Sequence, residues 1–154
     1  MKAVVQRVID ACVTVDGVKK GGIRSGLLVY LGVAHEDGES DADRLADKIA
    51  NLRIFNDADG KMNLSLKDTI AGGTQDIGVL VVSQFTLLAD ARKGRRPSWN
   101  GAAAPEKAKN LYEYFMKKIK EQGLSCECGE FQAHMKVTYT NDGPVTILLD
   151  TQEF

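Results

Sequence analysis

Two nearly continuous apolar runs constrain the fold of this chain more than any other feature. They are Gly26–Ala34 (GLLVYLGVA) and Gly78–Phe85 (GVLVVSQF). Runs of this length without polar alternation are typical of strands that are covered on both faces. Met1–Val15 instead alternates towards a long strand and ends at Asp16-Gly17, a dipeptide typical of a hairpin turn. The sequence therefore predicts a sheet with buried central strands.

Two segments show helical periodicity. The first starts at Ser40, a candidate N-cap, and ends near Asn51–Arg53. The second starts at Pro105, which suits the first turn of a helix, and is terminated by Gly123. Apolar residues recur within both at helical spacing: Leu45, Ile49 and Leu52 in the first, and Leu111, Phe115 and Ile119 in the second.

The remaining elements complete one domain over residues 1–154, as a chain of this length favours. Their order is roughly ββαβββαβββ, which is not the strict alternation of a doubly wound sheet. We therefore expect an α/β fold with a mixed, curled (partial-barrel) sheet and two main helices. The last strands are rich in apolar residues, and a second copy would bury one of their faces. The short strands are predicted at Arg53–Phe55, Ser125–Phe131, Met135–Thr140 and Val145–Leu149.

The net charge of −1 argues against a protein that grips nucleic acid through its overall charge. Any RNA binding must use a local patch, and the only dense one is Arg92–Arg96 (RKGRR) in the polar loop Ala89–Gly101. The alternative for such a short basic run is a solvated loop.

Cysteine and histidine give no sign of a metal centre. The three cysteines include no CxxC pair, which fits a reducing cytoplasm and inert packing better than a thiol nucleophile. The two histidines, His35 and His134, lie far apart in the sequence, so we expect neither a metal nor a cofactor. No apolar stretch reaches the roughly 20 residues of a membrane span, and the alternating N-terminus is typical of a strand rather than of a signal peptide.

Two polar segments stand out from this framework. Ser83–Leu87 (SQFTL) places two hydroxyls and an amide where a buried strand ends, a common position for binding groups. Asn141–Thr146 (NDGPVT) is a strong turn signal. On composition alone, a strand end with capping hydroxyls explains the first segment better than a functional site does, and the second is a tight turn whether or not it also takes part in chemistry.

Both segments are similar to the two signature motifs of the D-aminoacyl-tRNA deacylases. The resemblance extends to MKAVVQRV at the start, to RIFNDADGKMNLSL at Arg53–Leu66 and to KGRRPSW at Lys93–Trp99. It therefore covers most of the chain and keeps the order of the motifs. It implies a homodimer of curled α/β subunits with active sites at the interface. The implied substrate is the ester between a D-amino acid, or glycine, and the terminal adenosine of tRNA.

The resemblance also assigns roles to residues. The catalytic segment is Ser83, Gln84, Phe85 and Thr86. Chirality selection and substrate binding fall to Gly143, Pro144, Val145, Thr146 and Met135. The tRNA contacts are Arg92, Lys93, Arg95, Arg96 and Trp99.

Two catalytic routes are open. Thr86 as a covalent nucleophile would need an adjacent base, and its motif contains none. We favour the other route, in which backbone N–H groups around Phe85–Thr86 hold the oxyanion and the 2′-hydroxyl of the terminal ribose helps to activate water. The resemblance further implies a cis bond at Gly143-Pro144. Inserted into the partner's site, this turn would use backbone carbonyls to block an L side chain, a steric rejection that a glycyl ester escapes.

The chain departs from the family pattern at four positions. Gln132 and His134 stand where the family commonly has Gly and Asp, and Arg95 and Trp99 stand where Asn and Phe are expected. Two other classes of protein compete with a hydrolase. One is a non-catalytic RNA-binding module that uses the basic loop and Trp99, and the other is a protein whose only role is dimerisation.

Overall fold

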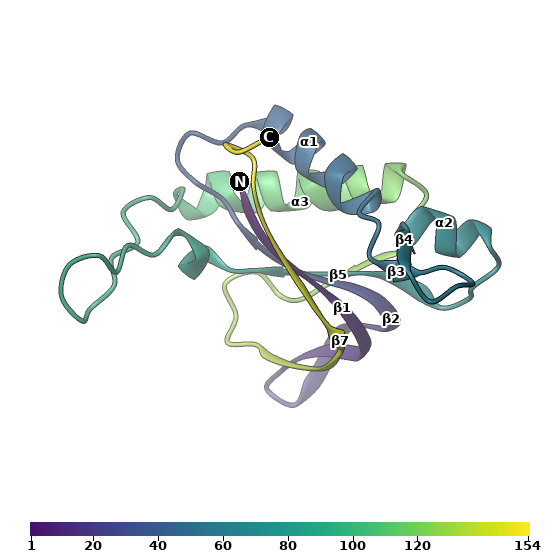
Figure 1. The fold of residues 1–154 in the computed structure, drawn as a ribbon. Coiled ribbons are helices and arrows are strands. Elements are labelled where there is room, and N and C mark those ends of the chain that lie inside the picture. Colours follow the sequence, from purple (N-terminus) through teal and green to yellow (C-terminus); the bar gives the residue numbers. More distant parts are fainter.

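The computed structural model describes residues 1–154, and its centre is a five-stranded sheet. The strand order is β6-β5-β2-β1-β7. β1 pairs antiparallel with β2 and β7, whereas β5 pairs parallel with β2 and β6. The sheet is therefore mixed, as predicted, and it curls strongly along its length (Figure 1). Its strands are β1 (Lys2–Val15), β2 (Val18–Gly32), β5 (Ile77–Ser83), β6 (Cys126–Cys128) and β7 (Lys136–Asp150).

Both long helices cover the same face of this sheet (Figure 1). These are the two main helices that the sequence predicts: α1 (Glu39–Ala50) and α3 (Pro105–Glu121). The main core lies between helices and sheet, where the side chains of Leu45, Val79 and Phe115 are fully buried. The smaller elements are β3 (Phe55–Asn56), β4 (Met62–Leu64), α2 (Leu66–Ala71) and a 3₁₀ turn at Phe85–Leu88. No helix combines the length and apolar character needed to cross a bilayer.

Two predictions about helices were wrong or incomplete. The N-cap of α1 is Gly38 rather than Ser40. The Asp41 carboxylate accepts a hydrogen bond from the Gly38 N–H at 3.0 Å, so a side chain inside the helix caps it in place of a hydroxyl before it. Helix α2 was not predicted, because its six residues are too few to show a periodic stripe. It begins at a capping box formed by Ser65 and Asp68.

The prediction of two separate final strands was also wrong. β7 runs unbroken from Lys136 to Asp150, and both of its halves pair with β1. The register moves from Gln6 opposite Thr146 to Val8 opposite Asn141. The Asn141–Thr146 segment is thus a bulge opposite Arg7 and does not reverse the chain. A local turn signal does not tell whether the flanking segments pair with each other or, as here, with a third strand.

The opposite face of the sheet carries no helix (Figure 1). A second, smaller apolar cluster lies there, formed by Val8, Ala11, Val13, Leu28, Leu80 and Val82. Only partly buried side chains pack against it, among them Met135 and Tyr139. On the edge strand β7, the Leu148 side chain is 76% exposed. This part of the molecule therefore has apolar surface that no helix covers.

Candidate active site

The SQFT segment lies at the carboxyl end of β5, as predicted. The Gln84 N–H donates to the Leu31 carbonyl at 2.8 Å, which continues the parallel ladder for one residue beyond the strand. The chain then enters the 3₁₀ turn at Phe85. The Gln84 amide donates to the Thr86 hydroxyl, and both the Phe85 and Thr86 side chains are exposed. The N–H groups of Phe85 and Thr86 open the turn, where backbone donors have no partner within a helix.

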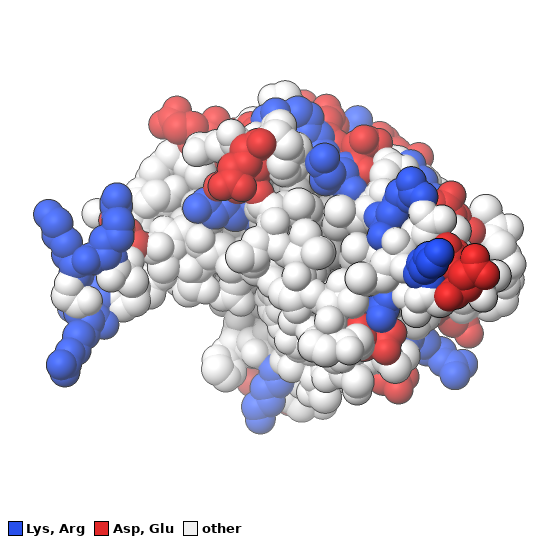
Figure 2. All heavy atoms as spheres, viewed as in Figure 1, with Lys and Arg blue, Asp and Glu red and all other residues white.

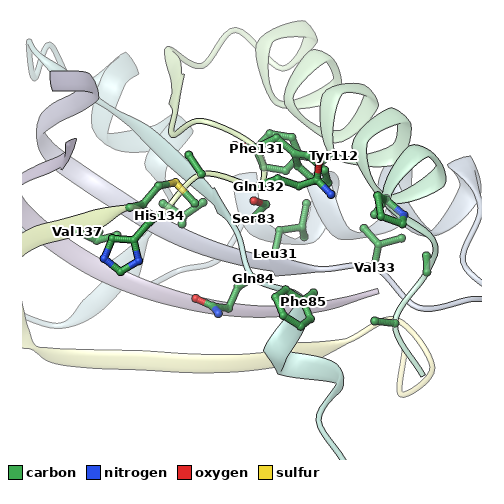
Figure 3. Close-up of a pocket in the computed structure, with 17 residues that line it drawn as sticks. Leu31, Val33, Ser83, Gln84, Phe85, Tyr112, Phe131, Gln132, His134 and Val137 are labelled. Atoms are coloured by element: carbon green, nitrogen blue, oxygen red, sulfur yellow. The ribbon is translucent and has the colours of Figure 1, made fainter. Parts of the chain in front are cut away.

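A cavity of about 580 Å³ opens beside this strand end (Figure 3). This volume lies within the usual range for small-molecule sites. Ser83, Gln84 and Phe85 form one wall, and α3 and the Phe131–Met135 loop form the others. The Tyr112 hydroxyl donates to the Val81 carbonyl at 2.8 Å, and burial raises the pKa of this phenol. The cavity wall is mostly apolar, with a few polar groups from the strand end and the loop.

The Gly143-Pro144 turn is held in place by the side chain of Arg7. Arg7 Nε donates to the Asp142 carbonyl at 3.1 Å, and Nη1 donates to the Ile54 carbonyl at 2.8 Å. A Cβ on Gly143 would lie 2.8 Å from Val145 Cγ2 and 3.2 Å from Arg7 Nη2, and φ at this glycine is +132°, so only glycine fits this position. The bond between Gly143 and Pro144 is cis, the conformation that the sequence analysis predicts.

Asn141 stabilises the same turn by hydrogen bonds within it. Its side-chain oxygen accepts from the Val145 N–H at 3.1 Å, and its amide donates to the Thr146 hydroxyl at 3.0 Å. Gln6 donates to the same hydroxyl at 3.0 Å. Gly143 and Pro144 themselves are exposed. The turn is therefore fixed in shape while its backbone remains accessible.

The basic loop projects from the body of the molecule (Figure 1), and Lys and Arg side chains gather on it (Figure 2). Paired backbone hydrogen bonds between Asp90 and Ser98, at 2.8 and 3.0 Å, close its base. Arg92 binds the Asp90 carboxylate with Nε at 2.9 Å and Nη2 at 2.6 Å, and these hydrogen bonds hold the pKa of that carboxyl well below its usual range. The cations without such an ion pair are Lys93, Arg95 and Arg96. The segment Arg92–Arg96 contains four basic side chains, and the charge of one of them, Arg92, is paired with Asp90.

Trp99 connects the basic loop to the strand end. Its indole meets the Phe85 ring edge-to-face, with ring centroids 5.7 Å apart. The two side chains are 39% and 59% exposed, respectively. The loop that carries the free cations is therefore anchored next to the SQFT segment.

Cysteine and histidine side chains can also act as nucleophiles, bases or metal ligands. Burial raises the pKa of the Cys126 thiol to about 12, so this thiol is protonated at neutral pH. The Nε2 atom of His35 lies 2.5 Å from the Asn100 carbonyl, which ties down the end of the basic loop. No group of three or more His, Cys, Asp or Glu side chains is arranged to hold a metal ion. His134, by contrast, lines the cavity.

The single chain brings together only part of the predicted site. Of the residues assigned from the sequence, only Ser83, Gln84, Phe85 and Met135 line the cavity. Thr86, the Gly143–Thr146 turn and the basic loop lie outside its lining. The contacts of Arg7 and Tyr112 were not predicted from the sequence. The one available signal for Arg7 was a charge within the alternating first strand, and Tyr112 is indistinguishable from ordinary core on its helix.

The fold and the site together define a small α/β protein with a cavity at the carboxyl end of a buried strand, a place where rigid elements often position binding groups. The sequence matches the family model for D-Tyr-tRNA(Tyr) deacylase over residues 4–150. The chain therefore belongs to this family, as its two motifs indicate.

Known relatives of this family are similar to the chain along nearly its whole length. A D-aminoacyl-tRNA deacylase from Koribacter versatilis (strain Ellin345) is 58% identical over 153 residues, with 99% of each chain covered. One from Clostridioides difficile (strain 630) has the same identity and coverage. A solved structure titled c-Myc DNA Unwinding Element Binding Protein superposes with a TM-score of 0.87 at 39% identity, covering 97% of this chain and 98% of the other. A probable eukaryotic D-amino acid tRNA deacylase shares the fold, with a TM-score of 0.80 at 14% identity and coverage of 96% and 97%.

Proposed function

We propose that this chain hydrolyses the ester that joins a D-amino acid, or glycine, to the terminal adenosine of tRNA. The observation that carries the proposal is the SQFT strand end opening directly on a cavity of nucleoside size. The relatives that match the whole chain are named for the same reaction. The cavity wall carries the half-buried Phe131 ring, which packs against the buried Tyr112 ring with centroids 5.8 Å apart. Aromatic surface of this kind suits an unstacked base.

In this arrangement the terminal nucleoside occupies the cavity and the ester carbonyl lies at the mouth, against Phe85 and Thr86. The backbone N–H groups at the start of the 3₁₀ turn stabilise the oxyanion. The ribose 2′-hydroxyl assists the attacking water. The only side chain hydrogen-bonded to the Thr86 hydroxyl is the Gln84 amide, which is not a base. This supports the RNA-assisted route over a threonine nucleophile, and the route uses no metal or cofactor.

Rejection of L-aminoacyl esters is assigned to the Gly143-Pro144 turn of a second subunit. The turn is exposed and does not line the cavity of its own subunit. An apolar sheet face without a helix and the exposed Leu148 supply surface for a homodimer. Within the dimer, the carbonyls of the turn would occupy the space that an L side chain needs, with Val145, Thr146 and the partner's Met135 around it. A D side chain points away from this obstacle, and glycine has none to clash.

The basic loop is assigned to the phosphates of the tRNA, through Lys93, Arg95 and Arg96, with Trp99 at its base. Arg92 contributes chiefly by shaping the loop through its contact with Asp90. Such an enzyme works where tRNAs are charged, and we place it in the cytoplasm. Its free thiols, Cys12, Cys126 and Cys128, are consistent with a reducing compartment.

The decisive experiment is release of amino acid from D-aminoacyl-tRNA and from the matching L-aminoacyl-tRNA, each measured with and without EDTA. The proposal requires rapid release from the D substrate only, unchanged by the chelator. An RNA-binding module or a dimerisation protein would release nothing. A metal-dependent hydrolase would lose its activity in EDTA.

A further inference from the structure

Gln132 has an unusual backbone for its residue type. Its φ is +65°, in the left-handed region that few residues other than glycine adopt. Three other non-glycine residues share this feature, and all of them are aspartates: Asp10, Asp16 and Asp76. Short aspartate side chains stabilise this conformation by local hydrogen bonds, whereas a glutamine gains little from them. Glycine would fit the Gln132 backbone without strain.

The side chain of Gln132 is placed at the cavity. The residue lines it from the loop between β6 and β7, and it is exposed to the cavity rather than packed into the core. Figure 3 shows Gln132 towards the Tyr112 and Phe131 side of the cavity, with His134 and Val137 at the other end. A polar side chain on an unfavourable backbone, facing a largely apolar ligand cavity, indicates a role in binding.

We infer that Gln132 reads the edge of the terminal adenine, an inference that rests on the proposed function. Phe131 provides aromatic surface for the base, and the neighbouring Gln132 carboxamide carries one donor group and one acceptor. This pair matches the 6-amino group of adenine and the ring nitrogen next to it, so the two groups form a bidentate contact. Gln132 is thus a specificity-determining residue for the nucleoside end of the substrate, separate from the groups around the ester.

The test compares two nucleotides as competitive inhibitors of D-aminoacyl-tRNA hydrolysis. One is AMP, and the other is purine riboside 5′-monophosphate, which lacks only the 6-amino group. The parent protein should bind AMP about three- to tenfold more tightly, the worth of one hydrogen bond. Gln132→Gly should abolish this preference and raise KM for D-aminoacyl-tRNA by a similar factor, with kcat little changed. Because glycine accepts the backbone conformation, this variant should fold at least as well as the parent.

Two control variants separate the edge contact from other effects. His134→Ala changes the same cavity without removing the carboxamide, and it should keep the preference for AMP. Asp16→Gly relieves a left-handed residue in the exposed hairpin turn, which does not line the cavity, and should leave both inhibitors unaffected. A persistent preference for AMP in Gln132→Gly would overturn the inference, as would equal binding of the two nucleotides to the parent. Either result could accompany full hydrolysis of D-aminoacyl-tRNA, whereas failure of the proposed function would abolish hydrolysis itself.

Discussion

Arg7 Nε lies 3.1 Å from the backbone oxygen of Asp142 and 3.1 Å from its Oδ2 atom. One guanidinium thus holds both the backbone and the side chain of the residue before Gly143. The Arg7 side chain is only 11% exposed, so water does not readily replace these contacts.

We therefore expect Arg7→Ala to free the turn. The rate constant kcat/KM for D-aminoacyl-tRNA should fall at least about tenfold, since a hydrogen bond to a charged group contributes about 1.5–3 kcal/mol. The preference for D over L substrates should fall as well. Lys2→Ala is a matched control, because Lys2 also joins β1 to β7 through an ion pair with Asp150, but with a side chain that is 46% exposed. An unaltered D/L ratio in Arg7→Ala would show that Arg7 does not position the turn for selection.

Thr86→Ala should retain activity within about tenfold of the parent, because no base is hydrogen-bonded to the Thr86 hydroxyl. A substrate that ends in 2′-deoxyadenosine should react about a hundredfold more slowly, as expected when a group that assists proton transfer is lost. Single-turnover rates with the two substrates and the two proteins measure both effects. Isolation of an aminoacyl ester on Thr86 would establish the nucleophile route instead.

The free cations of the basic loop should dominate the salt dependence of tRNA binding. Arg95→Ala and Arg96→Ala should each flatten the slope of log K against log [salt] by about 0.7–0.9, the value of one phosphate contact. Arg92→Ala should change the slope less, because Asp90 already pairs with this charge. Binding titrations at several salt concentrations test this order. Equal slopes in the parent and all three variants would leave the loop as a solvated surface.

Asp37 should be essential for stability, though it takes no part in the site. Its Oδ1 atom lies 2.6 Å from the α-ammonium of Met1, and the two groups are 4% and 0% exposed. Asp37→Ala leaves a buried charge without a counter-ion and should lower the free energy of unfolding by about 3–5 kcal/mol. The exposed pair Lys109–Glu113 on α3 gives the comparison, and Glu113→Ala should cost at most about 1 kcal/mol. Urea unfolding of both variants measures the difference. Similar losses in the free energy of unfolding would mean that the buried pair contributes no more to stability than the exposed pair.

The sequence predicts the elements of this fold well wherever a pattern is long. The apolar run Gly26–Ala34 contains the second half of β2, the run Gly78–Phe85 contains most of β5, and the periodic segments became α1 and α3. Prediction from the sequence failed where the pattern was short or ambiguous. Helix α2 offers too few residues to show a period, and the Asn141–Thr146 turn signal could not show that both flanks pair with β1.

The sequence alone determined which two contiguous motifs, Ser83–Thr86 and Asn141–Thr146, are proposed to carry chemistry. Tertiary structure decided what surrounds them. The cavity combines a strand end, helix α3 and the Phe131–Met135 loop, and Arg7 reaches a partner 135 positions away. It also decided that Trp99 packs on Phe85 and that Gln132 lines the cavity with a left-handed backbone. The reason is physical: residue patterns report local conformation and burial, whereas contacts between distant segments depend on strand register and on how the elements pack.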